Sequence, residues 1–144
     1  MAITRDEVIT LVSAFHETVM IKKGTAEQQA AFFLYPEPRI YIPHGQDVTL
    51  QTNYDIHQRL TNEVHVPLDE WDIIPLCEDP ERVRAVGAIY WEGRVKQGPA
   101  EAVLKCIVGE DWIVQRLPSG ELKIALYINP YHYFLPDSAR IDLH

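Results

Sequence analysis

The stretch VRAVGAIYWEGRV, residues 83–95, indicates the fold most clearly. Its odd-numbered positions are all apolar or small, and its charged residues, Arg84, Glu92 and Arg94, all fall on even positions. A period of two places successive side chains on opposite faces of a β-strand. The middle of the stretch is apolar on both faces, so we expect a long strand inside a sheet.

Further strands are expected on both sides of this stretch. Turn sequences rich in Gly, Pro, Asp and Ser separate the segments, which is typical of strands joined by hairpins. We therefore expect an antiparallel run of strands, with Gly109 marking a bulge. The expected strands cover residues 40–42, 48–50, 66–76, 100–117 and 122–128.

The N-terminal third has helical periodicity instead. Thr4 and Glu7 form a capping box, and apolar residues then recur at intervals of three and four. Gly24 is expected to end this helix, and Thr25 to cap a second helix that runs to about residue 34. Helices followed by strands predict an α+β fold, with the helices packed on one face of a curved sheet.

A third helix is expected to begin at Thr52 or Asn53 and to run to about residue 64. Its period of three and four would give it one inner stripe. The residues of that stripe are Asn53, His57, Leu60 and Val64.

Composition favours one cytoplasmic domain over residues 1–144. The net charge of −8 disfavours binding to nucleic acid and to anionic membranes, which both require a basic surface. The N-terminus lacks the pattern of a signal peptide, and no apolar run approaches the roughly 20 residues of a membrane helix. Cys77 and Cys106 have no metal-type spacing, so we expect two buried thiols in a reducing compartment.

Two short stretches resemble the nuclear transport factor 2-like superfamily, whose cone-shaped fold is also called cystatin-like. KKGT, residues 22–25, followed by AFF, residues 31–33, is similar to the stretch between the first helix and the first strand of that superfamily. YIPHG, residues 41–45, is similar to its strand-end acidic-x-Pro-x-Gly stretch. The order of elements also matches over residues 4–135. The chain looks closest to the SnoaL-like and ketosteroid isomerase-like subgroup, which implies a sheet wrapped around N-terminal helices with a ligand cavity between them.

The resemblance does not extend to the isomerase chemistry. In ketosteroid isomerase-like members, a carboxylate at this strand end is the base that transfers the proton. The residue before Pro43 in this chain is Ile42, which carries no proton. The tyrosine expected in the first helix is replaced by Phe15, which has no hydroxyl group. The isomerase mechanism is therefore not expected here.

Two histidines are the candidate catalytic residues. His44 follows Ile40 and Ile42 at intervals of two, so it is expected to face the core side with them. His57 lies on the inner stripe of the expected third helix, which the resemblance places against the same cavity. A neutral imidazole accepts a proton at about pH 7, and a second imidazole can orient or protonate the substrate. The structural alternative is a solvated turn histidine and a half-buried helix histidine.

The expected cavity suits a small hydrophobic molecule without a cofactor or a metal. A wide apolar space with one or two polar groups binds flat apolar ligands, although core packing is the alternative for each aromatic residue. Adding His65 to the two candidate histidines gives spacings that match no zinc signature. The candidate ligand-binding residues are Phe15, Tyr41, Ile42, Ile89 and Trp91.

The competing hypothesis is a non-catalytic dimerisation or scaffold module. The resemblance includes such modules, for example the small subunits of ring-hydroxylating dioxygenases, whose convex sheet face forms the interface. Tyr90, Ala125, Tyr127 and Asn129 would then meet a second copy of the chain. A homodimer is expected under either hypothesis.

Overall fold

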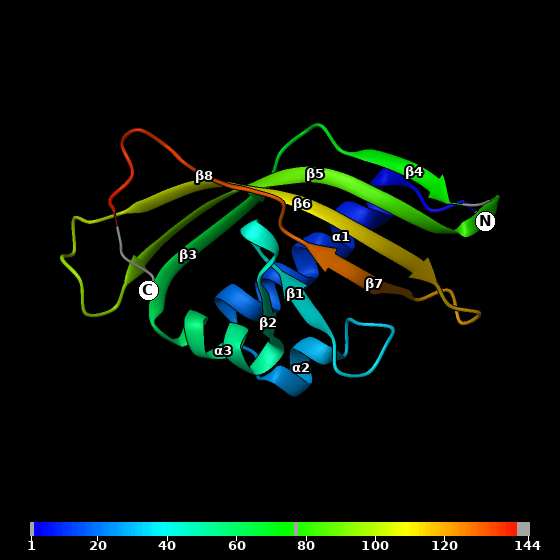
Figure 1. The fold of residues 1–144 in the computed structure, drawn as a ribbon, viewed down its shortest axis with the longest axis horizontal. Coiled ribbons are helices and arrows are strands. Elements are labelled where there is room, and N and C mark those ends of the chain that lie inside the picture. Colours follow the sequence, from blue (N-terminus) through cyan, green and yellow to red (C-terminus); the bar gives the residue numbers. More distant parts are fainter. Residues whose placement is uncertain (1, 77, 141–144) are drawn as a thin grey trace.

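The computed structural model describes residues 2–76 and 78–140, apart from the side chain of His44. Five short helical elements and eight strands are found in this part of the chain, and Figure 1 shows how they are arranged. The helical elements are α1 (Arg5–His16), which continues into a π-helical turn η1 (Glu17–Ile21), then α2 (Ala26–Ala30), the 3₁₀ turn η2 (Pro43–Gly45) and α3 (Leu50–Gln58). The strands are β1 (Arg39–Tyr41), β2 (Asp47–Thr49), β3 (Leu60–Pro67), β4 (Asp72–Leu76), β5 (Asp79–Val95), β6 (Leu104–Arg116), β7 (Leu122–Ile128) and β8 (His132–Phe134).

The capping box that the sequence predicts at Thr4 is present, and the predicted cap at Thr25 also forms a capping box. The Thr4 hydroxyl accepts a hydrogen bond from the backbone N–H of Glu7, and the Glu7 carboxylate accepts one from the backbone N–H of Thr4. Thr25 and Gln28 make the same reciprocal pair at α2. These side chains satisfy backbone donors that have no partner inside the helix, and they fix where each helix starts.

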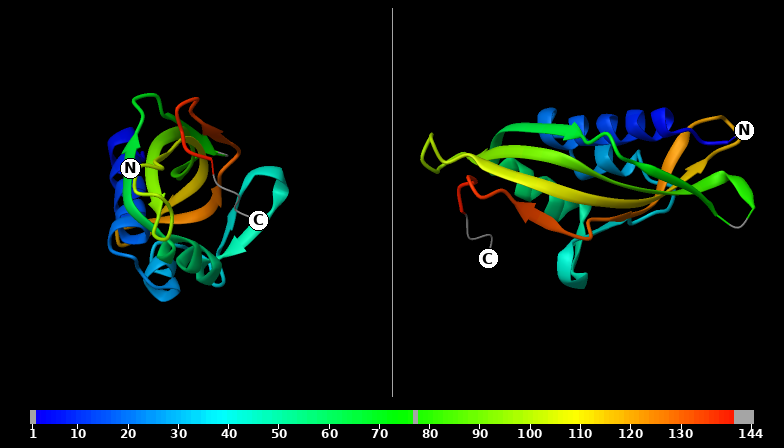
Figure 2. Two further views of the ribbon diagram at one scale, coloured as in Figure 1. Left: turned by 90° about the vertical axis from the view of Figure 1, so that its left-hand side faces the viewer. Right: turned by 90° about the horizontal axis from the view of Figure 1, so that it is seen from above.

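The sheet is one curved layer whose hollow side faces α1 (Figures 1 and 2). Its strand order is β2-β1-β7-β6-β5-β3, with β4 also paired to β5 and β8 to β6. The α+β prediction is confirmed. The sheet is mixed rather than wholly antiparallel, because β1 pairs with β7 in parallel. These two strands are far apart in the sequence, which leaves room for the long crossover that a parallel pair requires.

The concave face of the sheet forms the core with α1. On β5, Val83, Ala85, Ile89 and Trp91 are all buried, as the alternation in the sequence predicts. Phe15 of α1 reaches into this face and is 1% exposed. Its ring lies against five others, those of His16, Phe32, Phe33, Trp112 and Tyr127.

Gly87 interrupts the row of larger side chains on β5 because a ring lies over it. A Cβ atom at this position would lie 2.1 Å from Cδ2 of Trp71. Trp71, just before β4, is 6% exposed. The glycine therefore lets the chain fold back over β5 and bury a tryptophan.

The third helix and the strand after it differ from the prediction. α3 ends at Gln58, and Leu60 and Val64 belong to β3 rather than to a helical stripe. Asn62 has a φ of 52°, a left-handed conformation that neither a helix nor a regular strand continues through. The expected strand 66–76 is in fact two strands, β3 and β4, which both pair with β5.

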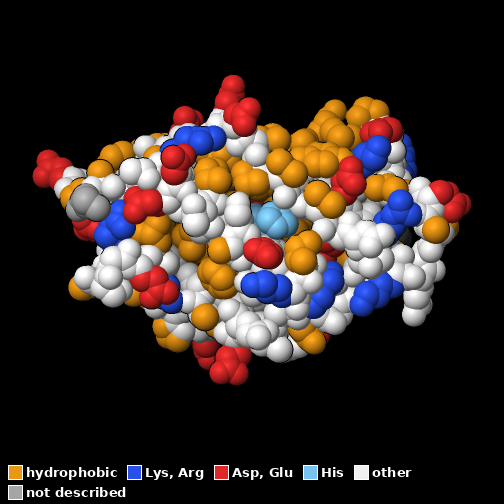
Figure 3. All heavy atoms as spheres, turned by 180° about the vertical axis from the view of Figure 1, so that it is seen from behind, with side chains coloured by type: hydrophobic (Ala, Val, Ile, Leu, Met, Phe, Trp, Pro, Cys, Tyr) orange, Lys and Arg blue, Asp and Glu red, His pale blue; other side chains and the backbone are white. Residues whose placement is uncertain are grey.

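Several large hydrophobic side chains remain at the surface of the molecule. Seen from behind, hydrophobic side chains are spread over the upper part of the surface, while Lys and Arg side chains lie mostly below and at the margins (Figure 3). The exposed hydrophobic residues include Val64, Val66, Leu68, Ile74, Tyr131, Tyr133 and Phe134.

No helix among residues 2–76 and 78–140 is both long and apolar enough to cross a membrane.

Candidate functional site

A buried carboxylate lies at the centre of the concave face. Glu110 of β6 is 1% exposed, and its Oε2 accepts hydrogen bonds from Trp112 Nε1 at 2.7 Å and from Asn129 Nδ2 at 2.8 Å. Its Oε1 lies 3.5 Å from both His16 Nε2 and the Tyr127 hydroxyl. Strand alternation explains the position, since Glu110 and Trp112 share the inner face of β6. We call these five residues the Glu110 cluster.

His16 joins α1 to this cluster. Its Nε2 lies 3.0 Å from the Tyr127 hydroxyl, and the side chain is 2% exposed. Its Nδ1 is buried and has no hydrogen-bond partner among the described residues. A buried polar atom without a partner is uncommon in native proteins and calls for a water, an ion or a ligand.

His65 of β3 stands next to His16. The two ring centroids are 5.6 Å apart, and Nδ1 of His65 is also buried without a partner in the described part of the chain. His65 is half-buried, so part of its side chain reaches solvent, whereas His16 is buried. Two imidazoles with unpaired nitrogens, backed by a carboxylate and a phenol, form a set that can take up and return protons.

The surroundings of these groups shift their protonation. Burial raises the pKa of the Tyr127 hydroxyl well above its ordinary value, and the nearby Glu110 carboxylate raises it further. Burial also lowers the pKa of His65, and the adjacent His16 adds to this, whereas Glu17 and Glu63 oppose it. Tyr127 is therefore a neutral hydroxyl at physiological pH, and His65 favours the neutral imidazole.

The lowered pKa of His65 predicts a direct signal in a titration. Its folded-state pKa lies below the usual 6.5, so the unfolded chain binds the proton more tightly. The contribution of His65 to the free energy of unfolding is thus complete above pH 6.5 and is lost as the pH falls through the folded-state pKa. Proton–carbon NMR of the imidazole Cε1–H groups should give His65 a midpoint below 6.5. A midpoint at or above that value would contradict the burial of the ring.

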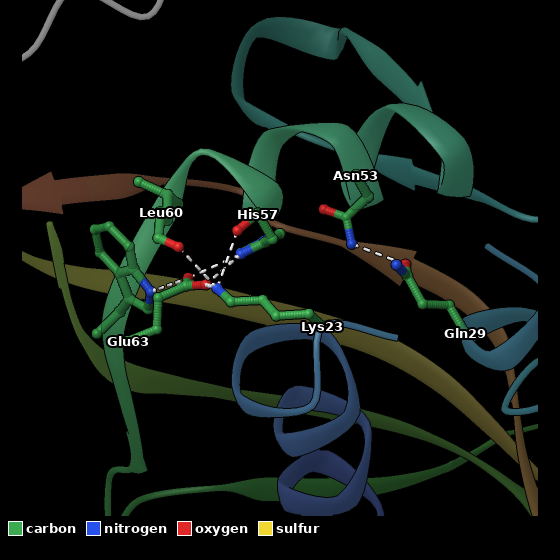
Figure 4. A network of polar contacts seen from close by, with 7 residues as sticks. Lys23, Gln29, Asn53, His57, Leu60 and Glu63 are labelled. Atoms are coloured by element: carbon green, nitrogen blue, oxygen red, sulfur yellow. Dashed lines mark hydrogen bonds and ion pairs between the residues drawn. The ribbon is translucent and has the colours of Figure 1, made fainter. Parts of the chain in front are cut away.

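Strand β3 carries a second buried carboxylate. Glu63 accepts hydrogen bonds from Lys23 Nζ at 2.6 Å, from His57 Nδ1 at 2.8 Å and from Trp91 Nε1 at 2.9 Å (Figure 4). Lys23 also donates to the backbone carbonyls of His57 and Leu60. Lys23, His57, Glu63 and Trp91 are called the Glu63 cluster.

The Glu63 cluster has its partners in place. Burial alone would raise the pKa of Glu63, but the hydrogen bonds and charge of His57, together with the bonds from Lys23 and Trp91, lower it overall. A carboxyl group with a lowered folded-state pKa stabilises the protein above its usual pKa, and this stabilisation is lost as the pH falls through the folded-state value. A carboxylate with three donors is a structural feature rather than an open reaction site.

The structure does not test the predicted catalytic pair, because the side chain of His44 is not among the described ones. His57 is on the inner side of α3 as expected, but its Nδ1 is bonded to Glu63. His44 lies in the η2 turn, and its side chain is outside the described residues. The pairing of His44 with His57 therefore stays a prediction.

The predicted ligand-binding residues fall into two groups. Phe15, Ile89 and Trp91 are buried on the concave side, where Phe15 contacts the Glu110 cluster and Trp91 the Glu63 cluster. Tyr41 is 38% exposed and Ile42 is half-buried, at the end of β1. Ligand binding by these residues stays a prediction.

Two surface cavities lie outside the cone. One, of about 590 Å³, lies beside α1 and reaches Phe32 and Leu122; the other, of about 710 Å³, lies between α2 and the β1–β2 hairpin. Neither is lined by a residue of the Glu110 cluster. Because aromatic rings fill the interior around Phe15, a molecule that reaches His16 must move side chains.

Metal binding finds no support among the described residues, which contain no group of three or more His, Cys, Asp or Glu arranged to hold an ion. Cys106 is a free, buried thiol, and burial raises its pKa to about 11, so it is a poor nucleophile. Cys77 lies outside the described residues.

His16, Glu110 and Tyr127 were not predicted as site residues, although a signal for the first two was present in the sequence. His16 follows Val12 by four residues, which places it on the apolar face of α1. Glu110 is the one charged residue at the even positions 104–114, which are otherwise apolar. Tyr127 and Asn129 face inward, so their predicted place on a convex dimer interface is wrong. A polar residue on an apolar face was the signal for His16 and Glu110, whereas Tyr127 faces inward only because the pairing of β6 with β7 shifts its register beyond Ile124.

Comparisons with known proteins identify the fold. No protein-family model matches the sequence, and no curated protein does either. Among solved structures, a putative scytalone dehydratase from Novosphingobium aromaticivorans gives a TM-score of 0.70 at 10% identity, over 94% of this chain and 90% of that chain. A hexachlorocyclohexane dehydrochlorinase, LinA-type3 from Novosphingobium barchaimii, gives 0.64 at 12% identity, over 96% and 94%.

A ketosteroid isomerase-like protein from Erwinia carotovora atroseptica also matches, with a TM-score of 0.57 at 9% identity, over 84% of this chain and 90% of that chain. The chain thus has the nuclear transport factor 2-like, SnoaL-like fold that the sequence resemblance predicts. Identities this low establish the fold and leave the chemistry to the residues of the site.

Proposed function

We propose that this chain, folded as a nuclear transport factor 2-like cone, binds a small hydrophobic molecule in its interior and transfers a proton on it. The observation that carries the proposal is the buried Nδ1 of His16, which has no hydrogen-bond partner among residues 2–76 and 78–140 as described. The other nitrogen of His16 faces the Tyr127 hydroxyl and the Glu110 carboxylate. His16 is the proposed base. His65, whose Nδ1 is also unpaired, is the second imidazole that orients or protonates the substrate.

The arrangement provides the parts of such a step. A carboxylate beside one ring nitrogen stabilises the imidazolium that forms when the other nitrogen takes a proton. The surrounding rings of Phe15 and Trp112 exclude water, which strengthens this interaction. Isomerisation, cyclisation and elimination, including dehydration, each need a proton removed from one atom and returned to another. The dehydratase-like and dehydrochlorinase structures of the same fold support this class of reaction.

The ring opening of nitrobenzisoxazole tests the proposal, because this probe reacts with any base held in an apolar site. His16→Gln retains a polar group near Tyr127 but removes the base, and it is expected to lower the rate by about 10²-fold or more. Lys22→Met, an exposed change on the neighbouring turn, is the control. Equal rates for the parent and His16→Gln would overturn the proposal. A lower rate in His57→Gln but not in His16→Gln would indicate that the site lies at the rim of the cone, as the sequence predicts.

A second candidate function, a dimeric scaffold module, is supported by the outer face of the sheet. A row of apolar side chains crosses four strands there, since Val66 pairs with Tyr90, Tyr90 with Ile107 and Ile107 with Tyr133. Val66 and Tyr133 are 49% and 56% exposed. A hydrophobic row of this kind on a sheet face is suited to contact with a second copy of the chain.

Light scattering after size-exclusion chromatography tests this second candidate. Val66→Lys is expected to convert a dimer into a monomer, whereas Gln51→Lys on the exposed side of α3 should leave the mass unchanged. A parent protein that is monomeric at high concentration would rule out the scaffold function. The catalytic and scaffold functions are compatible, because they use opposite faces of the sheet.

A further inference from the structure

From Glu63 to Val66, β3 turns its polar side chains inward and its apolar ones outward. Glu63 is 4% exposed and His65 pairs with buried Trp91 on the concave side. Val64 and Val66, which alternate with them, are 44% and 49% exposed. A strand with one buried face normally turns its valines inward, because burying apolar surface is the main stabilising term. Other interactions must therefore hold β3 in the opposite orientation.

A β-bulge sets this orientation. Thr61 pairs with Arg94, but the next pair is Val64 with Glu92, so Asn62 and Glu63 together face the single residue Gly93. The extra residue requires the left-handed conformation of Asn62. Without the bulge, the uninterrupted register would place Val64 opposite Trp91 and His65 opposite Tyr90. Both valines would then face the core, and His65 would face the solvent.

The Glu63 cluster is what holds the bulge in place. The three hydrogen bonds to the Glu63 carboxylate fasten the bulged residue to α3, through His57, and to β5, through Trp91. Lys23 adds bonds to the carbonyls of His57 and Leu60, on either side of the turn that leads into β3. Lys23 is itself in a left-handed conformation, with a φ of 53°. The bonds to the Glu63 carboxylate depend on the bulge, because the uninterrupted register would pair Glu63 with Glu92 on the outer face.

We infer that Lys23 and Glu63 are positioning residues that hold β3 in the register in which His65 faces the interior. Loss of either one shifts β3 beyond the bulge by one residue relative to β5. The shift buries Val64 and Val66 and turns His65 out to solvent. The importance of this register for activity rests on the proposed function, whereas the register itself does not.

Disulfide trapping reads the register directly. Two cysteine pairs are placed in a chain that carries Cys77→Ser and Cys106→Ala. The pair at positions 64 and 92 closes in the observed register, and the pair at 65 and 90 closes in the shifted one, because only directly opposed residues come close enough. Each pair is tested in the parent, with Lys23→Met, and with Lys22→Met as the matched control.

The first pair is expected to close in the parent and in Lys22→Met, and the second pair in Lys23→Met. Closure of the first pair alone in a folded Lys23→Met protein would overturn the inference. If Lys23→Met fails to fold by circular dichroism, Glu63→Gln takes its place, because it keeps the shape of the side chain while removing its charge. Failure of the second pair to close in Glu63→Gln would equally overturn the inference.

Two readouts separate this inference from the proposed function. In Lys23→Met with the native His65, the midpoint of the His65 imidazole signal should return toward 6.5, its ordinary pKa. The nitrobenzisoxazole rate should fall as far as in His65→Gln. A shifted register with an unchanged rate supports the inference and counts against the proposed function, whereas an unshifted register counts against the inference alone.

Discussion

Replacement of Glu110 by leucine is expected to lower the free energy of unfolding by about 3–5 kcal/mol. The carboxylate accepts hydrogen bonds from Trp112 and Asn129, and a leucine accepts neither. Trp112 Nε1 would then lose its hydrogen-bond acceptor, and Asn129 Nδ2 would keep only its bond to the Gly109 carbonyl, which together outweigh the gain from removing a buried charge. Glu110→Gln is expected to lose less than half as much, because its amide oxygen can still accept both bonds. Denaturation with urea, followed by circular dichroism, measures each difference.

The matched control is Glu121→Leu. This carboxylate lies on the surface with its side chain 61% exposed, and its removal is expected to change the stability by about 0.5 kcal/mol or less. A Glu110→Leu protein as stable as the parent would show that Trp112 and Asn129 do not depend on the carboxylate. The Glu110 cluster would then not be held as the contacts indicate.

Phe15→Ala is expected to destabilise the protein by about 3–5 kcal/mol, the usual range when a buried phenylalanine is truncated. The Phe15 ring contacts five other rings and joins α1 to the concave face of the sheet. Its removal leaves a cavity directly beside His16 and Tyr127. The same urea denaturation measures the loss.

Phe134→Ala is the comparison for this second prediction. Phe134 of β8 is 42% exposed, so its truncation should change the stability by about 1 kcal/mol or less. Equal losses for the two variants would mean that Phe15 is not the centre of the core. A small Phe15→Ala loss would indicate that the interior is loosely packed around it.

Local signals in the sequence predicted the fold class and most element types. The capping boxes at Thr4 and Thr25 depend on residues three positions apart, so a single sequence is enough to read them. The long strand β5 was also readable, because its period of two extends over many residues. The parallel pairing of β1 with β7 was not, since it depends on contacts between residues that are far apart in the chain.

The region after α3 was misread because tertiary contacts override its pattern. Leu60 and Val64 continue a helical spacing from His57, and the valines of β3 suggest the wrong inner face. The bulge at Asn62 and the burial of Glu63 depend on Lys23 and Trp91, which lie elsewhere in the sequence. A pattern within one segment contains no information about such partners.

The candidate site in the structure lies deeper in the fold than the pair predicted from the sequence, for a related reason. Sequence reasoning chose His44 and His57 because they stand near a strand end and on a helical stripe. The structure ties His57 to Glu63, and it places His16, His65, Glu110 and Tyr127 around one another from four different elements. These elements converge because the sheet curves around α1, and the pattern within a single segment does not contain this information.

Nitrogen NMR of the imidazole rings during a titration with nitrophenol tests the central claim, that the interior beside His16 is the binding site. The Nδ1 signals of His16 and His65 are expected to shift together and saturate, since neither nitrogen has a partner within the described part of the chain, while His57 Nδ1, bonded to Glu63, stays unchanged. A saturable shift of His57 with His16 and His65 unaffected would show that the molecule binds at the rim of the cone instead.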